Sequence, residues 1–196
     1  MKLDEKTLPS AGLIKSELKR ERNKIRYRRI LKNAVYSLVI VAAVAVLIAT
    51  LILPVLQISG TSMEPTLNNG EIVILLKTQK LSKGDLCGFS YSNKILIKRV
   101  IALPGDTVYI ESDGTVLVNG EVLDEPYVSD KALGECDIEF PYTVPENEYF
   151  LMGDHRATSI DSRSSVIGCV PKEQIVGKIF LKVWPLKEIT FISSPE

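Results

Sequence analysis

Residues 34–53 read AVYSLVIVAAVAVLIATLIL, and this run decides how the chain is built. It lies within an uncharged stretch that extends from Asn33 to Met63. A helix over these 20 residues would be about 30 Å long, which matches the hydrocarbon core of a bilayer. Pro54 follows and favours an end to the helix. We therefore predict one transmembrane helix.

A cleaved signal peptide is the alternative interpretation of this run. The apolar region of a signal peptide spans about 7–15 residues and precedes a small-x-small cleavage site. The run here is longer, and PVLQI at residues 54–58 offers no such site. The sequence therefore favours a retained anchor.

Charge is distributed unevenly along the chain. Lys and Arg balance Asp and Glu at 24 each, but residues 1–33 carry a net +7 and the remainder −7. Because basic flanks stay on the cytoplasmic side, we predict a single-pass protein of the cell membrane with a cytoplasmic N-terminus and an extracellular domain. The alternative, a basic helix that binds nucleic acid, has only Tyr27 interleaved among its basic residues. We expect no nucleic-acid partner.

The pattern predicts three zones: a basic tail at 1–33, helical from about Ser16, an anchor at 34–56, and a domain at 57–196. The domain reads as mainly β, because short apolar runs alternate with Asn-Gly, Asp-Gly and Pro-Gly turns. We predict strands at 72–76, 94–101, 115–118, 149–152 and 178–184. Residues 129–145 are polar and predict a surface excursion, and residues 171–175 predict a short helical turn.

Ser62, in SGTSMEPTL at residues 59–67, is a candidate nucleophile just beyond the anchor. A serine hydroxyl needs a base to remove its proton. Two bases are open. The sole histidine, His155, allows a Ser62/His155/Asp161 triad. Lys98 is the other, since strand alternation places it beside Leu96 and Val100, and an apolar setting lowers a lysine pKa from about 10.4. A surface lysine whose stem covers apolar residues is the structural interpretation of the same pattern.

The segment GDHRATSIDSR, residues 153–163, is dense in acidic, basic and hydroxyl side chains. Such a loop either holds itself together by ion pairs and turn bonds or orients a reacting group. Cys87, Cys136 and Cys169 have no paired or metal-ligand spacing, and small apolar packing roles are favoured for them. We expect no metal and no cofactor.

Taken together and in this order, the serine segment 59–67, the lysine segment IKRVIALPGD at 97–106 and the loop 153–163 resemble bacterial type I signal peptidase. A looser fourth match, Lys83-Gly84-Asp85, lies between the first two. The resemblance covers the anchor and nearly all of the domain. It implies a fold of coiled antiparallel β-sheets, and a Ser/Lys endopeptidase that removes signal peptides after small residues at −1 and −3.

The resemblance also implies roles for particular residues. Ser62 would be the nucleophile and Lys98 the general base. Five polar residues would support them, with Ser159 bonded to the lysine amine and two ion pairs: Ser159, Asp161 with Arg163, and Asp154 with Arg99. Four apolar residues would line shallow substrate pockets: Ile58, Met63, Leu67 and Ile97. The implied partners are preprotein signal peptides and membrane lipid, with the protein export machinery as a further candidate.

Some positions depart from the family pattern. His155 stands where asparagine is common, and Gly60 stands where some relatives have a serine that helps to bind the oxyanion. The oxyanion would then rely on the Ser62 amide. Two other functions remain open: a hydrolase that uses His155, and a non-catalytic β domain tethered for binding. A self-cleaving repressor-type Ser/Lys protease carries a DNA-binding domain, and residues 34–53 argue against it.

Overall fold

The computed structural model describes residues 11–193, except for the side chains of residues 48–52. Residues 1–10 of the predicted basic tail lie outside this description. The chain divides into two compact units with a boundary between Ala49 and Thr50, and we describe each by itself.

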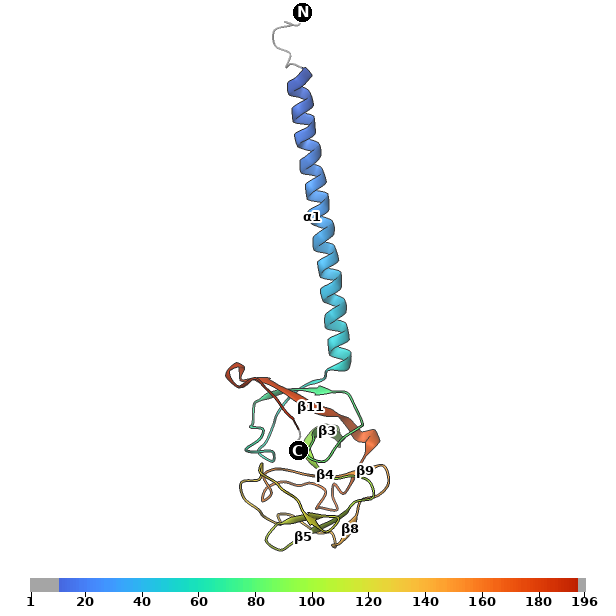
Figure 1. Cartoon of the computed structure of the whole chain (residues 1–196), viewed down its shortest axis with the longest axis vertical. Helices are drawn as coiled ribbons and strands as arrows, with labels where there is room; N and C mark the ends of the chain where they lie inside the picture. Colours follow the sequence, from blue (N-terminus) through green and yellow to red (C-terminus); the bar gives the residue numbers. More distant parts are fainter. Residues whose placement is uncertain (1–10, 194–196) are drawn as a thin grey trace, which may run out of the picture. The chain divides into compact units, whose positions relative to one another are not determined.

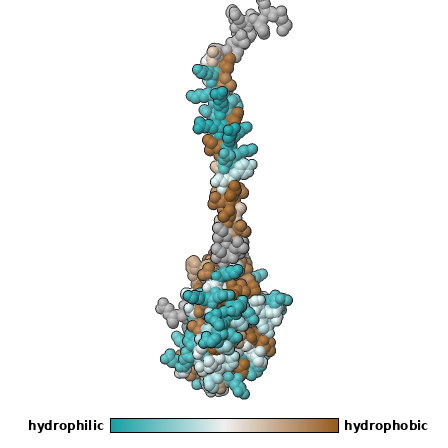
Figure 2. Space-filling view, turned by 90° about the vertical axis from the view of Figure 1, so that its right-hand side faces the viewer, coloured by the Kyte–Doolittle hydropathy of each residue, from teal (hydrophilic) through white to brown (hydrophobic). Residues whose placement is uncertain are grey.

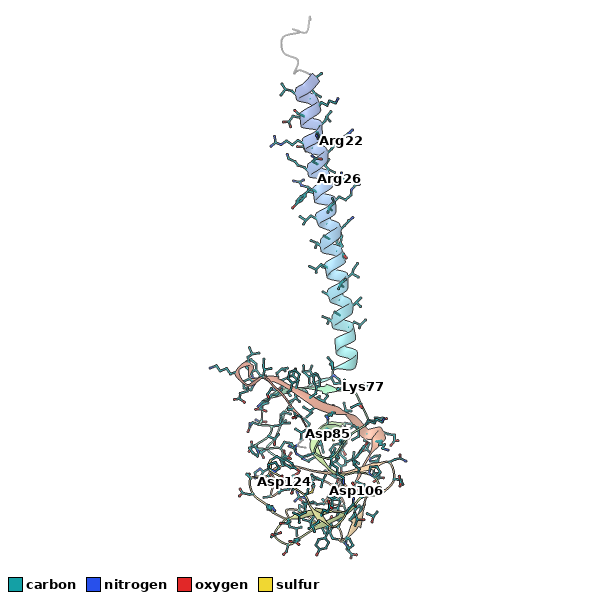
Figure 3. The ribbon with its side chains drawn as sticks, in the orientation of Figure 1. Arg22, Arg26, Lys77, Asp85, Asp106 and Asp124 are labelled. Atoms are coloured by element: carbon teal, nitrogen blue, oxygen red, sulfur yellow. The ribbon has the colours of Figure 1, made fainter. Side chains whose placement is uncertain are left out.

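Helix α1, Ala11–Ile52, forms the described part of the first unit, extends three residues past its boundary and runs without a break (Figure 1). Within it, Ala11–Leu47 is long and apolar enough to cross a membrane, with a window of mean hydropathy 2.2. Hydrophilic side chains, among them Arg22 and Arg26, occupy the N-terminal half, and a hydrophobic band follows (Figures 2 and 3). The helix ends two residues before Pro54, as predicted.

The second unit is built almost entirely from antiparallel β-strands. Its strands are β1 Val55–Gln57, β2 Ile72–Leu76, β3 Leu86–Tyr91, β4 Lys94–Ala102, β5 Thr107–Ile110, β6 Val116–Val118, β7 Glu121–Val122, β8 Tyr142–Thr143, β9 Glu148–Met152, β10 Val170–Pro171, β11 Ile175–Trp184 and β12 Thr190–Phe191. Two short 3-10 helices, Lys172–Gln174 and Leu186–Glu188, interrupt the C-terminal part. The predicted fold class, mainly β after one apolar helix, is confirmed.

Two sheets make up this unit. The larger has the order β1-β2-β11-β3-β4-β9-β10, with β12 paired to β11, and the smaller has the order β7-β6-β5-β8. The hairpin of β3 and β4 is the centre of the larger sheet and carries the register Cys87↔Lys98 and Gly88↔Ile97. Beyond Lys98, β4 pairs on its other side with β9, from Arg99 to Ala102. The N-terminal half of β4 therefore keeps one edge free of any other described strand.

Buried apolar side chains form three clusters, and the first joins the two sheets while the other two lie with the larger sheet. One lies with the smaller sheet around Val108 and Phe150, the second around Phe89 and Leu151, and the third around Leu67 and Leu75. Residues from the three segments singled out in the sequence border these clusters. The site is thus built on packed strands, which fix its side chains more closely than free loops would.

The structure differs from the predicted elements in several places, and the strands β5, β7, β8, β10 and β12 were not predicted. Strand β3 was not predicted, because its Gly, Cys and Ser residues dilute the β-branched signal. Strand β1 begins at Val55, two residues before the expected start of the domain, and β6 begins at Val116. The prediction that residues 129–145 are only a surface excursion is wrong: Val144 is buried, and Leu133 and Phe140 pack against the first cluster.

Candidate active site

Ser62 lies in a tight turn between β1 and β2. The Glu64 amide donates to the Thr61 carbonyl at 3.0 Å, and the Leu67 amide donates to the Met63 carbonyl at 2.9 Å. Met63 and Leu67 are buried in the third cluster and anchor the turn from below. Ser62 itself is half-buried and lines a cleft at the surface of the domain.

Lys98 projects from β4 toward this turn. Its amine Nζ lies 2.8 Å from Ser62 Oγ, and only 4% of the residue is exposed. Burial lowers the pKa of Lys98, and the Arg163 guanidinium adds to the effect, while the Asp161 and Asp154 carboxylates oppose it. The surface interpretation of this lysine is therefore wrong. A buried amine beside a hydroxyl is the arrangement that proton abstraction requires.

Asp161 organises the loop between Gly153 and Arg163. Its carboxylate accepts the Ser159 hydroxyl at 2.7 Å, the Gly153 amide at 2.9 Å and Arg163 Nε at 2.8 Å. Asp161 and Arg163 are both fully buried. Arg163 also donates to the carbonyl of Leu133 at 2.6 Å, which ties the loop to the 129–145 segment. A buried carboxylate needs such partners, because an unpaired buried charge is costly.

The position of Ser159 differs from the expectation in one respect. Its hydroxyl was expected to bond the Lys98 amine, but it donates its proton to Asp161 instead. A carboxylate is the stronger acceptor, since hydrogen bonds to ionised groups are roughly twice as strong as neutral ones. Ser159 nevertheless lies close to the Ser62 turn, because both residues approach the same point of Gly153. A Cβ added to Gly153 would lie 2.2 Å from Ser159 Oγ and 2.5 Å from the Ser62 carbonyl oxygen.

Arg99 and Asp154 form the second buried ion pair. Arg99 Nε donates to Asp154 Oδ1 at 2.8 Å, and Arg99 Nη2 donates to Asp154 Oδ2 at 2.6 Å. The Thr66 hydroxyl donates to the same carboxylate at 2.5 Å, which joins the serine turn to the loop. The Tyr127 ring covers the guanidinium, with Arg99 Cζ 3.7 Å from its centroid. The roles of Thr66 and Tyr127 could not be predicted from the sequence, because both contacts join distant segments.

The Ser62/His155/Asp161 triad is not assembled. The carboxylate of Asp161 is bonded to Ser159, Gly153 and Arg163, and within the described residues the buried Nδ1 of His155 has no hydrogen-bond partner. The backbone of His155 does contribute, since its amide donates to the Ser62 carbonyl at 3.1 Å. His155 therefore helps to hold the turn through its main chain.

A cleft of about 110 Å³ opens beside Ser62 and Lys98. Three of the four predicted pocket residues line it: Ile58, Met63 and Ile97. The fourth, Leu67, does not, because it is fully buried in the third cluster. Two lining residues were missed, Leu56 and Ile95. Each lies two residues before a predicted one, on the same face of its strand, so period-two alternation could have found both.

The described residues contain no group of three or more His, Cys, Asp or Glu side chains that could hold a metal ion. The three cysteines are free thiols; Cys87 is buried opposite Lys98, and Cys136 and Cys169 are partly buried. The reactive groups that the site offers are the hydroxyl, the amine and the backbone amides around them.

Comparison with known proteins identifies the family. Residues 31–184 match the family described as signal peptidase, peptidase S26. The chain belongs to the S26 signal peptidase family. A signal peptidase I of Bacillus licheniformis is 36% identical over 175 residues, which cover 81% of this chain and 93% of the relative. A signal peptidase IB of Staphylococcus aureus strain MRSA252 is 32% identical over 182 residues, covering 83% and 94%.

A crystal structure of a signal peptidase I from Enterococcus faecalis V583 is also similar, with 31% identity and a TM-score of 0.42 over 50% of this chain and 96% of that chain. Membership of the S26 family makes this chain a peptidase. The expected resemblance to type I signal peptidase is confirmed by the family match and by these relatives.

Proposed function

We propose that this chain is a membrane-anchored serine endopeptidase that cleaves signal peptides from exported preproteins, with Ser62 as nucleophile and Lys98 as general base. The observation that carries the proposal is the contact of 2.8 Å between Lys98 Nζ and Ser62 Oγ at a lysine that is 4% exposed. The names of the relatives supply the substrate class.

In the proposed reaction the neutral Lys98 amine takes the Ser62 proton as Oγ attacks the carbonyl carbon of the −1 residue. The tetrahedral intermediate collapses to an acyl-enzyme when the peptide C–N bond breaks, and the Lys98 ammonium gives its proton to the leaving amine. The amine of Lys98 then accepts a proton from a water molecule that attacks the ester. The ester bond then breaks, the Lys98 ammonium returns its proton to Ser62 Oγ, and the signal peptide leaves with a free carboxyl terminus.

The oxyanion of the intermediate needs hydrogen-bond donors that are already in position. Among the described residues the Ser62 amide donates to no other group, so it is available for this purpose. The His155 amide donates to the Ser62 carbonyl at 3.1 Å and fixes the peptide between Ser62 and Met63. Ser159, Asp161 and Arg163 act as positioning residues, and so do Asp154 and Arg99.

The substrate would bind as an extended strand. Strand β1 pairs only with β2, and the N-terminal half of β4 pairs only with β3, so both present a free edge to the cleft within the described residues. Extended peptides commonly add to free sheet edges. A cleft of about 110 Å³ is far below the roughly 300–1,000 Å³ of ordinary ligand pockets. It therefore suits small side chains at −1 and −3.

The anchor would keep this site at the outer face of the cell membrane. In this proposal residues 1–33 are cytoplasmic, residues 34–56 span the bilayer and residues 57–196 form the extracellular domain. The basic side chains on the N-terminal half of α1 support the orientation (Figure 3). Membrane lipid and the protein export machinery are the further partners that this location implies.

The proposal is tested with the full-length chain in detergent and a preprotein whose signal peptide ends in Ala-x-Ala. Wild type should cleave after the second alanine, and Ser62→Ala should lower kcat by on the order of 10⁴-fold or more. A serine-directed acylating reagent should label Ser62. Equal cleavage by Ser62→Ala would refute the mechanism. Absence of both cleavage and labelling in wild type would instead favour a non-catalytic binding domain.

A further inference from the structure

A short segment between β7 and β8 reaches the candidate active site from outside the three segments singled out in the sequence. It consists of residues 123–128, LDEPYV. The Leu123 amide donates to the Val116 carbonyl at 2.9 Å, and the Leu123 side chain packs against the first cluster. The segment is therefore fixed to the smaller sheet at its start. Two of its side chains, those of Glu125 and Tyr127, contact residues of the site.

Glu125 and Arg156 form a third buried ion pair beside the site. Arg156 Nη1 donates to Glu125 Oε2 at 3.0 Å, and Arg156 Nη2 donates to Glu125 Oε1. The Glu125 and Arg156 side chains are 2% and 0% exposed. Two parallel hydrogen bonds of this kind fix geometry as well as adding energy. A buried ion pair is weak evidence for a stabilising role, because apolar residues of similar volume often stabilise a protein as well. The pair is better explained by what it holds in place.

Arg156 connects this ion pair to the turn that carries the nucleophile. Its Nε donates to the Gly153 carbonyl at 3.1 Å, and its own carbonyl accepts Arg163 Nη2 at 3.0 Å. Gly153 in turn lies against the serine, because a Cβ added to it would lie 2.5 Å from the Ser62 carbonyl oxygen. Since this contact leaves no room for another atom, a shift of Gly153 toward the turn must move Ser62.

Tyr127 connects Glu125 to the other end of the same turn. The phenol donates to Glu125 Oε1 at 3.2 Å, and the ring lies over the Arg99 guanidinium, with 3.7 Å from Cζ to the ring centroid. Arg99 is paired with Asp154, whose carboxylate accepts the Thr66 hydroxyl. Glu125 thus reaches the serine turn by two routes, one through each of its partners.

We propose that Glu125 is a positioning residue that keeps the Ser62 hydroxyl aligned with the Lys98 amine. This inference rests on the proposed function and adds to it a residue from outside the three segments. Glu125 does not line the cleft, so its loss should lower kcat and leave KM unchanged. The charges that shift the Lys98 pKa are those of Asp161, Arg163 and Asp154. The acid limb of the pH–rate profile should therefore stay in place when Glu125 is replaced.

Stability alone is the competing reason for the buried pair. That role lowers the melting temperature of a variant but leaves kcat of the folded molecules unchanged. A positioning role lowers kcat in molecules that are fully folded. Removing both charges together separates the two roles, since it leaves no unpaired charge in the core.

The experiment compares full-length wild type in detergent with Glu125→Gln, Tyr127→Phe and the double variant Glu125→Met/Arg156→Met on one Ala-x-Ala preprotein. Rates are measured at a temperature where circular dichroism finds the variants folded. Glu125→Gln should lower kcat by about 10–10²-fold, because a misplacement of about 1 Å at a reacting group can cost about 10²-fold. Tyr127→Phe keeps the ring over Arg99 and should lower kcat less. The double variant should melt near the wild-type temperature and still show the loss in kcat, because no guanidinium then holds the Gly153 carbonyl.

Asp106→Asn is the control. It breaks the ion pair with Lys83, at 3.0 Å directly before β5, and Asp106 does not line the cleft, so kcat should stay as in wild type. An equal loss in this control would overturn the proposal, since any weakening of the smaller sheet would then lower kcat.

Wild-type kcat in folded Glu125→Gln would also overturn the proposal, and so would an acid limb that moves. If Glu125→Gln does not fold, the double variant decides: wild-type kcat in that variant would leave Glu125 a role in stability alone. In each of these cases wild type still cleaves the preprotein. Failure of the proposed function differs, because wild type would then not cleave it.

Discussion

Lys98 Nζ lies 2.8 Å from Ser62 Oγ, and nearly the whole lysine is removed from solvent. The two nearest carboxylates that oppose deprotonation, Asp161 and Asp154, are each bound to a buried arginine. Lys98 therefore lies out of contact with most solvent, and both of these carboxylates are paired with an arginine. This combination lowers the pKa of Lys98, with burial as the main cause, and it has a consequence for stability.

Lys98→Met should stabilise the protein at neutral pH while it abolishes cleavage. Because folding lowers the pKa of Lys98, the unfolded chain binds more protons than the folded chain between the two pKa values, and stability rises with pH across that window. The gain in Tm from the substitution should therefore shrink as pH rises toward about 10.4. Each 1 kcal/mol corresponds to about 2–4 °C in a protein of this size.

Lys182→Met is the matched control with the opposite sign. Burial disfavours the Lys182 ammonium, but its hydrogen bonds to Glu71 and Glu188 outweigh this and raise the pKa. Its contribution to stability is present at neutral pH and is lost as pH rises through the raised pKa. Thermal unfolding of both variants from pH 7 to 10 checks the prediction: the gain of Lys98→Met should shrink across this range, and the loss of Lys182→Met should stay nearly constant, because the Lys182 pKa is raised. A Lys98→Met protein that is less stable than wild type at pH 7 would contradict it.

His155→Ala should keep turnover within about 10-fold of wild type, because within the described residues the imidazole Nδ1 has no partner and the backbone amide that holds Ser62 survives the substitution. Lys98→Met should lose about 10²–10⁴-fold, the usual contribution of a general base. Initial rates on one preprotein measure both. Equal losses in the two variants would revive the histidine triad.

Asp161→Asn should be costly to stability and should shift the pH profile. The substitution leaves Arg163 buried without its counter-charge, which costs about 3–5 kcal/mol. Since Asp161 raises the pKa of Lys98 and Arg163 lowers it, loss of the carboxylate lowers this pKa further. The acid limb of kcat/KM against pH should then move to lower pH.

Asp137→Asn provides the comparison for this change. Asp137 accepts the Ser165 hydroxyl at 2.6 Å on the surface of the domain, so its loss should lower stability much less than the loss of Asp161 and should leave the profile in place. Denaturant unfolding and pH–rate profiles of both variants are the measurements. An acid limb that moves to higher pH in Asp161→Asn would show that Asp161 does not act on Lys98 by charge.

The sequence predicted the helix and several of the strands better than it predicted contacts between side chains. Period-two alternation through residues 94–101 placed Lys98 among apolar neighbours, because a strand sends alternate side chains to one face. The same pattern could not distinguish Leu67 from Met63: both are apolar and near the serine, and only the turn places one in the core and the other at the cleft. The hydrogen-bond partner of the Ser159 hydroxyl also could not be assigned, since both the Lys98 amine and the Asp161 carboxylate belonged to the expected site.

Contacts between distant segments were beyond the sequence for a physical reason. The crowding around Gly88 arises because side chains from β1, β2 and β4, those of Leu56, Leu75 and Ile95, meet at one point of β3. No local periodicity encodes that meeting. A glycine in a strand signals a close approach, but the side chains that approach it become known only from the fold.

Gly153→Ala should reduce catalysis out of proportion to its effect on stability. The added Cβ would lie 2.5 Å from the Ser62 carbonyl oxygen and 2.2 Å from Ser159 Oγ, so the turn that carries the nucleophile must move. A misplacement of about 1 Å at a reacting group can cost about 10²-fold. Gly177→Ala makes an equally severe clash, 2.4 Å from the Leu76 carbonyl oxygen, between β11 and β2 and not at the cleft.

Both alanine variants should therefore unfold at lower temperature, but only Gly153→Ala should lose about 10²-fold in kcat/KM. Rates are measured at a temperature where circular dichroism finds both variants folded, so that lost activity cannot come from unfolded chains. If Gly177→Ala lost as much activity as Gly153→Ala, general loosening of the β domain would explain both. Ser62 would then not depend on the close approach at Gly153 for its alignment with Lys98.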